Sequence, residues 1–121
     1  DNHMTLLRPT LTSCALLLAP LLAQANDFPT VDRVLYVQEC VRDNPGPHYE
    51  MINKCSCALD RIASEVKFDD YVSMSTIVNA TSIGGERGGQ LRDNETIKPQ
   101  IARYRELQAK ARKACFIGPP Q

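Results

Sequence analysis

Residues 40–59, CVRDNPGPHYEMINKCSCAL, decide the fold that this sequence predicts. They contain the end of one amphipathic segment, an Asn-Pro-Gly-Pro turn at 44–47 and the first half of a second segment. Proline and glycine at this density stop a helix, and so short a turn makes the two flanking helices antiparallel neighbours. Cys40 lies before the turn, and Cys55 and Cys57 lie after it. The stretch therefore predicts a helical hairpin with cysteines on both arms.

The spacing of these cysteines limits how they can pair. Counted from Gly46, Cys40 lies six residues before and Cys55 nine after, which is within about one turn of the same level at a rise of about 1.5 Å per residue. Residues two apart, such as Cys55 and Cys57, project about 200° apart around a helix, too far for a disulfide. We therefore expect Cys40 to bond one of these two and Cys115 the other, with either choice open. Each bridge should contribute roughly 2–4 kcal/mol.

Hydrophobic periodicity predicts the two arms of the hairpin as amphipathic helices, because apolar residues recur at three- and four-residue steps. Thr30 is the expected N-cap of the first helix. The first stripe is Val31, Val34, Leu35, Val37 and Val41, and the second is Ile52, Cys55, Leu59, Ile62 and Val66.

Two further helices follow the hairpin. We expect Asp69 or Asp70 to cap the third, whose apolar residues are Tyr71, Met74, Ile77 and Val78. Asn94 or Thr96 should start the fourth, with the stripe Ile97, Ile101, Tyr104, Leu107, Ala111 and Cys115. No stretch shows convincing strand alternation. The predicted fold class is therefore all-α: a small disulfide-stapled bundle of about four helices.

The N-terminus has the pattern of an export signal. Residues 1–3 are set aside as an expression remnant, and residues 4–25 contain Arg8, an apolar run at 11–23 and a small-x-small site at 23–25. Because a membrane span needs about 20 apolar residues, we expect cleavage, no stable membrane anchor afterwards and a single helical domain at 26–121. A lipobox pattern ending at Cys14 is the alternative, but the apolar run continues past it.

Charge and cysteine content indicate the compartment and the class of partner. The chain has 14 basic and 14 acidic residues, and removing residues 1–25 takes away one of each, Arg8 and Asp1. This neutrality argues against nucleic acid as a partner, because phosphate binding requires a basic excess. An even set of cysteines in an exported chain predicts a disulfide framework. We therefore expect a periplasmic protein whose partner is another periplasmic protein.

A second unusual segment is the glycine-rich stretch 84–93, GGERGGQLRD. It matches neither a phosphate-binding loop nor a dinucleotide fingerprint, and its glycines predict a loop. The stretch is either a plain linker or a partner-contact loop. The candidate contact residues are Gly84, Gly85, Glu86, Arg87, Gly88, Gly89, Arg92 and Asp93.

Candidate chemistry is sparse. His48 is the one histidine after residue 25, so no Ser-His-Asp or Cys-His catalytic set can be assembled, and we assign no catalytic residue, cofactor or metal. Thiol–disulfide exchange through Cys55 and Cys57 is one alternative. A metal carrier is another, although the cysteine spacing matches no standard zinc pattern. If the metal is a hard cation, its candidate oxygen ligands are the carboxylates of Asp69, Asp70, Glu86, Asp93 and Glu95.

A family resemblance adds a cellular setting. The chain resembles a group of small exported proteobacterial proteins associated with gene neighbourhoods of pyrroloquinoline-quinone (PQQ)-dependent alcohol dehydrogenases. The resemblance implies a quinoprotein dehydrogenase, its cofactor or its metal as the client, and carries over no catalytic residue. Together with export and the missing catalytic set, it predicts a non-enzymatic periplasmic accessory or binding protein. The matching residues are Cys55-Ser56-Cys57-Ala58-Leu59-Asp60, Tyr71-Val72, the glycines and charges of 84–89, Leu91-Arg92-Asp93 and Cys115-Phe116.

Overall fold

The computed structural model describes residues 26–119, and the regular secondary structure of that range is entirely α-helical. The predicted signal peptide at 4–25 and Cys14 lie outside the described residues. The all-α prediction is confirmed, and the four predicted helices are joined by one more, α4. The helices are α1 (Thr30–Asp43), α2 (His48–Glu65), α3 (Phe68–Thr81), α4 (Gly85–Arg92) and α5 (Lys98–Ala114).

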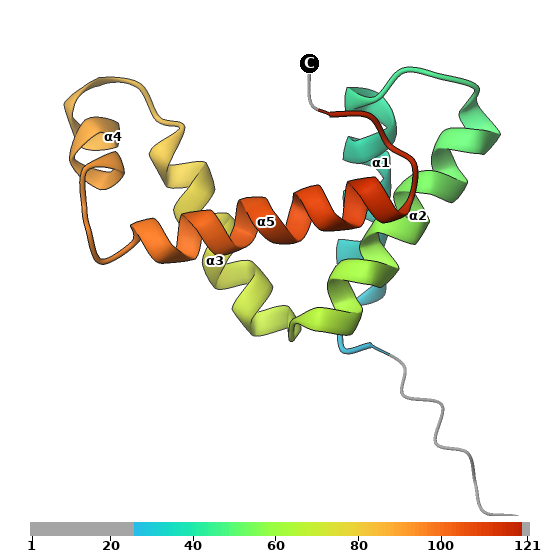
Figure 1. Ribbon diagram of the computed structural model, residues 1–121, viewed down its shortest axis with the longest axis horizontal. Helices are drawn as coiled ribbons and strands as arrows, with labels where there is room; N and C mark the ends of the chain where they lie inside the picture. The colour runs from blue at the N-terminus through green and yellow to red at the C-terminus, as the bar shows by residue number, and fades with distance from the viewer. Residues whose placement is uncertain (1–25, 120–121) are drawn as a thin grey trace, which may run out of the picture.

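Helix α5 runs across the molecule and organises the bundle (Figure 1). Helices α1 and α2 form the antiparallel hairpin predicted from the turn at 44–47, and α2 packs against α5. Helix α3 also packs against α5, and α4 packs against α3. Figure 1 places α4 at one end of α5 and the hairpin at the other.

The hydrophobic core centres on α2, as its sequence pattern predicts. Cys55 and Ile62 are completely buried on the face that meets α5 and α1. Helix α5 contributes Leu107 and Ala111 of its apolar stripe to this core, whereas α1 contributes no buried residue. The buried cluster comprises Phe28, Met51, Cys55, Ala58, Leu59, Ile62, Val66, Met74, Leu107, Ala111, Cys115 and Ile117.

The helices begin at slightly different residues from those predicted. Thr30 is the first residue of α1 and Pro29 occupies the cap position, so the predicted Thr30 cap is wrong by one residue. Helix α5 begins at Lys98 rather than at Asn94 or Thr96, with Pro99 in its first turn. Before it, the Asn94 side chain accepts a hydrogen bond from the Thr96 amide. This local Asx turn competes with the helix at the predicted start.

Helix α3 takes its cap from a distant segment. The backbone amide of Phe68 donates to both carboxylate oxygens of Asp27, each at 3.1 Å. Asp69 and Asp70, the predicted caps, lie inside the first turn instead. The carboxylate of Asp27 therefore pairs a free N-terminal amide and places negative charge at the positive end of the helix.

The predicted glycine loop is wrong, because most of it forms α4. Close packing gives the reason: a Cβ built on Gly88 would lie 1.7 Å from the carbonyl oxygen of Ile83, so only glycine fits there. Gly85, at φ +85°, makes the preceding turn. The Arg92 guanidinium then donates to the carbonyl oxygens of Thr81 (2.9 Å) and Ile83 (3.3 Å). These contacts offset the low helix propensity of glycine, roughly 0.5–1 kcal/mol per residue.

Candidate functional site

The disulfides connect α2 to α1 and to the residue that follows α5. Cys40 bonds Cys55 within the hairpin, and Cys57 bonds Cys115 at the end of α5, with Cα atoms 5.8 Å apart in each bridge. Of the two arrangements that the sequence leaves open, the structure selects this one. Cys55 lies on the buried stripe of α2 beside α1, while Cys57, two residues on, is directed elsewhere and meets α5. The two bridges indicate an oxidising compartment outside the cytosol.

Burial of the cysteines bears on the thiol-exchange alternative. Cys55 is 0% exposed and Cys115 is 2% exposed. A thiol used for exchange has to be reached by an attacking thiolate and activated by nearby positive charge. Cys55 and Cys57 belong to separate bridges, each with one end in the core. This arrangement is typical of structural disulfides.

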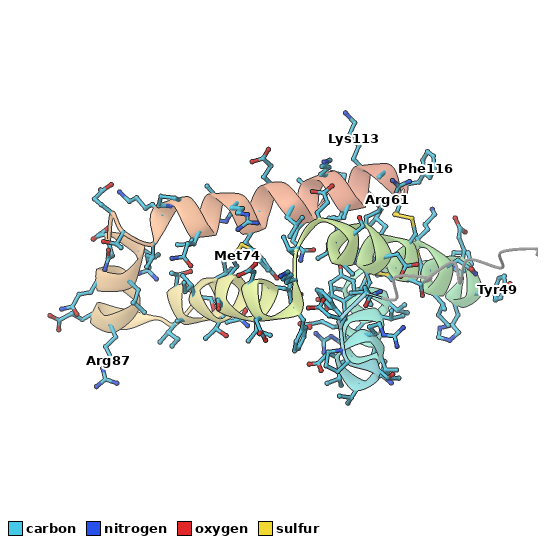
Figure 2. All side chains as sticks on the ribbon, turned by 90° about the horizontal axis from the view of Figure 1, so that it is seen from below. Tyr49, Arg61, Met74, Arg87, Lys113 and Phe116 are labelled. Atoms are coloured by element: carbon cyan, nitrogen blue, oxygen red, sulfur yellow. A yellow bond between two sulfur atoms is a disulfide. The ribbon has the colours of Figure 1, made fainter. Side chains whose placement is uncertain are left out.

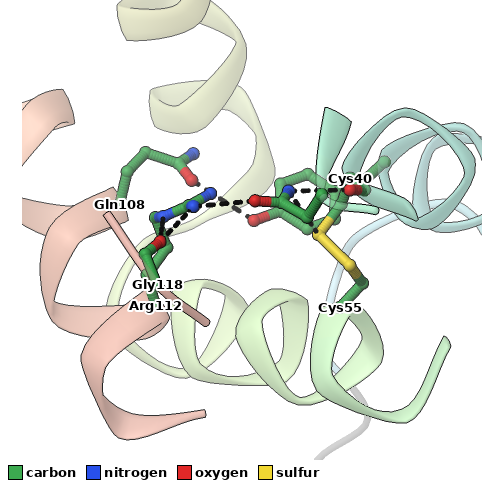
Figure 3. The surroundings of a disulfide bond; sticks show 7 residues. Cys40, Cys55, Gln108, Arg112 and Gly118 are labelled. Carbon is green, nitrogen blue, oxygen red and sulfur yellow. Dashed lines mark hydrogen bonds between the residues drawn. A yellow bond between two sulfur atoms is a disulfide. The ribbon is translucent and has the colours of Figure 1, made fainter. Parts of the chain in front are cut away.

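A hydrogen-bond network beside the Cys40–Cys55 bridge joins α1, α5 and the C-terminal segment (Figure 3). The side-chain amide of Asn44 donates to the carbonyl oxygen of Cys40 at 2.7 Å, and its oxygen accepts from Arg112 at 2.8 Å. Arg112 also donates to the carbonyl oxygen of Gly118. One guanidinium thus fixes the end of α1 and the chain after α5.

An apolar groove of about 680 Å³ lies between α1 and α2 on one side of the hairpin. Val34, about half exposed, contributes to it from α1, and Leu59 lies at its base. We call it the α1–α2 groove. Its apolar residues are Val34, Val37, Val41, Ile52 and Leu59, and its polar residues are Thr30, Arg33, Gln38, Arg42, His48, Ser56 and Asp60.

A second cavity, of about 410 Å³, lies on the other side of α1. The hydroxyl of Tyr36 donates to the side-chain oxygen of Gln108 at 3.2 Å and so connects α1 with α5. We call this the tyrosine cleft. It is lined from α1 by Asp32, Leu35, Tyr36, Glu39, Cys40 and Asp43, from α3 by Phe68, Tyr71, Val72, Ser75 and Asn79, from α5 by Tyr104, Gln108 and Arg112, and also by Phe28, Asn44 and Leu59.

Two tyrosines of this cleft, Tyr36 and Tyr71, stay protonated far into the alkaline range. Burial, followed by the neighbouring Tyr104 phenol, raises the pKa of Tyr36 to about 12. Burial and Tyr104 also raise the pKa of Tyr71 well above its usual value. Both side chains are therefore neutral hydrogen-bond donors with intact aromatic faces at physiological pH.

The candidate contact residues of 84–93 lie at the far end of the molecule from the hairpin. Glu86 and Arg87 are exposed on α4, and Figure 2 shows Arg87 directed away from the rest of the protein. Arg92 is instead engaged with the end of α3. This division leaves Glu86 and Arg87 free to meet a partner, and contact through α4 stays a prediction.

The ligands considered for a metal are scattered. Within residues 26–119, no three His, Cys, Asp or Glu side chains converge in a way that could hold a metal ion. His48 lines the α1–α2 groove, and the five carboxylates between Asp69 and Glu95 form no such group in this part of the chain. Across the same residues, no helix is both long and apolar enough to cross a membrane.

Sequence reasoning missed the groove and the cleft, although one signal was present. Besides its apolar stripe, α1 has a second set of residues at helical spacing: Asp32, Tyr36, Glu39 and Asp43. This set places an acidic and aromatic face beside the apolar one. Two distinct faces on one helix indicate two different neighbours, and in this structure they border the cleft and the groove.

Comparison with known proteins adds no relative: the chain matches no protein-family model, no curated protein and no solved structure.

Proposed function

We propose that this chain is a non-enzymatic accessory protein of the periplasm that binds another exported protein through the α1–α2 groove. One observation carries the proposal: α1 has an apolar stripe but no buried residue. Of that stripe, Val34, Val37 and Val41 line the groove, and Val34 is 49% exposed. Contiguous apolar surface with a polar rim is typical of a protein-binding site. The export pattern of residues 4–25 and the two disulfides support the compartment.

The charges around the groove favour one kind of occupant. Arg33 and Arg42 line it, against the single carboxylate of Asp60. An amphipathic helix with apolar residues on one face and carboxylates beside them would match both the groove and its rim. Binding of such a helix in an apolar groove between two helices is a common mode of peptide recognition.

The disulfide gives this surface a fixed shape. Cys40 lies in the last turn of α1, and its bond to Cys55 holds α1 at a set distance from α2. A groove that is rigid before binding loses less conformational entropy when a partner is bound. A binding role also fits the sequence prediction that no Ser-His-Asp or Cys-His set can be assembled around His48.

The client that we propose is a quinoprotein alcohol dehydrogenase system. Its support is the family resemblance at residues 55–60, 71–72, 84–89, 91–93 and 115–116. The α1–α2 groove lies apart from most of these positions, and Ser56, Leu59 and Asp60 are the ones that line it. The proposal therefore joins a surface from the structure with a client from the resemblance, and one experiment should test both.

The test measures binding of the exported protein to a purified quinoprotein alcohol dehydrogenase. Val34→Asp places a charge in the groove and should weaken binding by about tenfold or more, since desolvating a charge costs over 1.4 kcal/mol. Ile83→Asp is the matched control: Ile83 is 55% exposed and lies outside the groove. No binding by the unmodified protein would overturn the proposed client. Equal binding by both variants would overturn the proposed surface.

A further inference from the structure

The tyrosine cleft has the size of a small-molecule site. Its volume of about 410 Å³ falls within the range of roughly 300–1,000 Å³ that is usual for ligand pockets. It is lined by side chains of α1, α3 and α5. The cleft is on the opposite side of α1 from the α1–α2 groove, so it needs an explanation of its own.

Aromatic rings follow one another along the α3 and α5 sides of the cleft. The rings of Phe28 and Phe68 have centroids 5.2 Å apart, as do those of Phe28 and Tyr71. Tyr71 and Tyr104 follow at 6.0 Å. On the α1 side, Tyr36 is held by its hydrogen bond to Gln108. Three tyrosines therefore border one cavity, and each comes from a different helix: Tyr36 from α1, Tyr71 from α3 and Tyr104 from α5.

The charges on the cleft are predominantly negative. Asp32, Glu39 and Asp43 line it from α1, all on one helical face. Arg112 is the one basic side chain of the lining, and its guanidinium is already bonded to Asn44 and Gly118. Glu39 and Asp43 meet Arg42, but at the exposed surface, where water screens such pairs. A positive ligand is therefore favoured over a negative or neutral one.

We propose that the tyrosine cleft binds a small organic cation, namely a quaternary or protonated ammonium group. The faces of aromatic rings attract cations, and several rings around one cavity are the usual arrangement for recognising a quaternary ammonium. Tyr36, Tyr71 and Tyr104 would surround the ammonium group, and Glu39 would contribute the opposite charge. This site is independent of the groove and of its proposed client.

Choline and its uncharged isostere 3,3-dimethylbutan-1-ol provide the test, because they share a shape and differ in charge. Binding is measured by titration calorimetry on the exported protein, with chemical-shift changes at Tyr36 locating the ligand. Choline should bind, and the neutral alcohol should bind at least about fivefold more weakly, since a cation–π contact contributes about 1 kcal/mol. Equal binding of the two compounds, or no binding of choline up to about 10 mM, would overturn the proposal.

Substitutions then assign the residues. Tyr36→Leu should weaken choline binding by about fivefold, whereas Tyr36→Phe should retain it because the ring remains. Glu39→Gln should weaken binding by a similar factor, and Glu50→Gln, outside the cleft, should leave it unchanged. Tyr49→Leu is the matched aromatic control, since Tyr49 is 81% exposed and points away from the protein (Figure 2).

Two further outcomes decide the case. Circular dichroism of each variant separates loss of binding from loss of fold, and Glu39→Gln, at an exposed side chain, keeps the test valid if Tyr36→Leu unfolds. Weakening by Glu50→Gln equal to that by Glu39→Gln would show that general surface charge, not the cleft, attracts choline. Val34→Asp in the groove should leave choline binding unchanged, so the cleft and the proposed dehydrogenase surface can fail separately.

Discussion

Helix α2 packs against α1 and α5 and buries five side chains, whereas α1 packs mainly against α2 and buries none. Both helices have apolar residues at helical spacing. The difference lies in their position: α2 is central and α1 is at the edge, with a cavity on each side. Helical periodicity thus identifies an apolar face, while the number of neighbours decides whether that face becomes core or remains a binding surface.

The two helices are therefore held by different forces. Apolar burial stabilises α2 at about 25 cal/mol per Å². The position of α1 depends on partial burial of Val37 and Val41 against the core. It also depends on the Cys40–Cys55 bond, the Tyr36–Gln108 hydrogen bond and the Asn44–Arg112 contact. A helix fixed by a covalent bond and directional contacts can leave both of its flanks open. That is the property which the proposed groove and cleft both require.

The largest expected effect comes from removing the disulfides. Cys57→Ala with Cys115→Ala opens a separation of 58 residues, and chain entropy predicts a loss of about 4 kcal/mol in the free energy of unfolding. Cys40→Ala with Cys55→Ala opens a separation of 15, and the expected loss is about 3 kcal/mol. Urea denaturation of the two double variants measures both losses.

Hydrogen exchange separates the two bridges further. Without Cys40–Cys55, the amides of α1 should lose protection while those of α2 keep it, because α1 has no buried residue of its own. Without Cys57–Cys115, protection should fall in α2 and α5 together. If the amides of α1 stay as protected as in the unmodified protein after loss of its bridge, α1 does not depend on the disulfide. The proposed difference between α1 and α2 is then wrong.

The second prediction compares the two apolar stripes directly. Ile62 on α2 is 0% exposed, and Ile62→Ala should cost about 3 kcal/mol through lost burial and the cavity left behind. Val34 on α1 is 49% exposed, and Val34→Ala should change stability by no more than about 0.5 kcal/mol. Denaturation midpoints of the two variants check this. A large effect at Val34 would mean that α1 contributes to the core after all.

Much of this architecture could be predicted because its signals are local. The turn at 44–47 ends one helix and starts another within a few residues, and the α2 stripe has a clear period. The divergence of Cys55 and Cys57 around a helix follows from two residues alone. Each of these inferences concerns residues close together in the sequence. Helix geometry alone fixes the relative positions of such residues.

The features that escaped prediction depend on contacts between distant residues. Asp27 caps a helix that begins 41 residues later, and Arg92 reaches the carbonyl oxygen of Thr81 across 11 residues of chain. The tyrosine cleft joins Tyr36, Tyr71 and Tyr104 from three helices. No periodicity in one segment indicates such a meeting, because it depends on how the helices cross.

The third prediction concerns the polar attachment of α1 at high pH. The folded state raises the pKa of Tyr36 from 10.0 to about 12, so the unfolded chain loses this proton first. The contribution of Tyr36 is complete below pH 10 and is lost as the pH rises towards 12, by on the order of 2 kcal/mol. Denaturation at several pH values should show this fall, and Tyr36→Phe should make it shallower. Tyr49→Phe, at an exposed site, should leave the slope unchanged.

The smallest expected effect tests whether the chain before α1 is also held by directional contacts. Asp27→Ala removes the acceptor from the Phe68 amide and should lower stability by about 1 kcal/mol, the usual contribution of an N-cap. Asp27→Asn keeps a capping oxygen and should lose less. Urea denaturation measures both, and hydrogen exchange at the start of α3 locates the change. Equal stability of the Ala variant and the unmodified protein would mean that burial of the neighbouring Phe28, 4% exposed, holds this segment by itself. In that case the segment before α1 would resemble α2, and attachment by directional contacts would begin only at Tyr36.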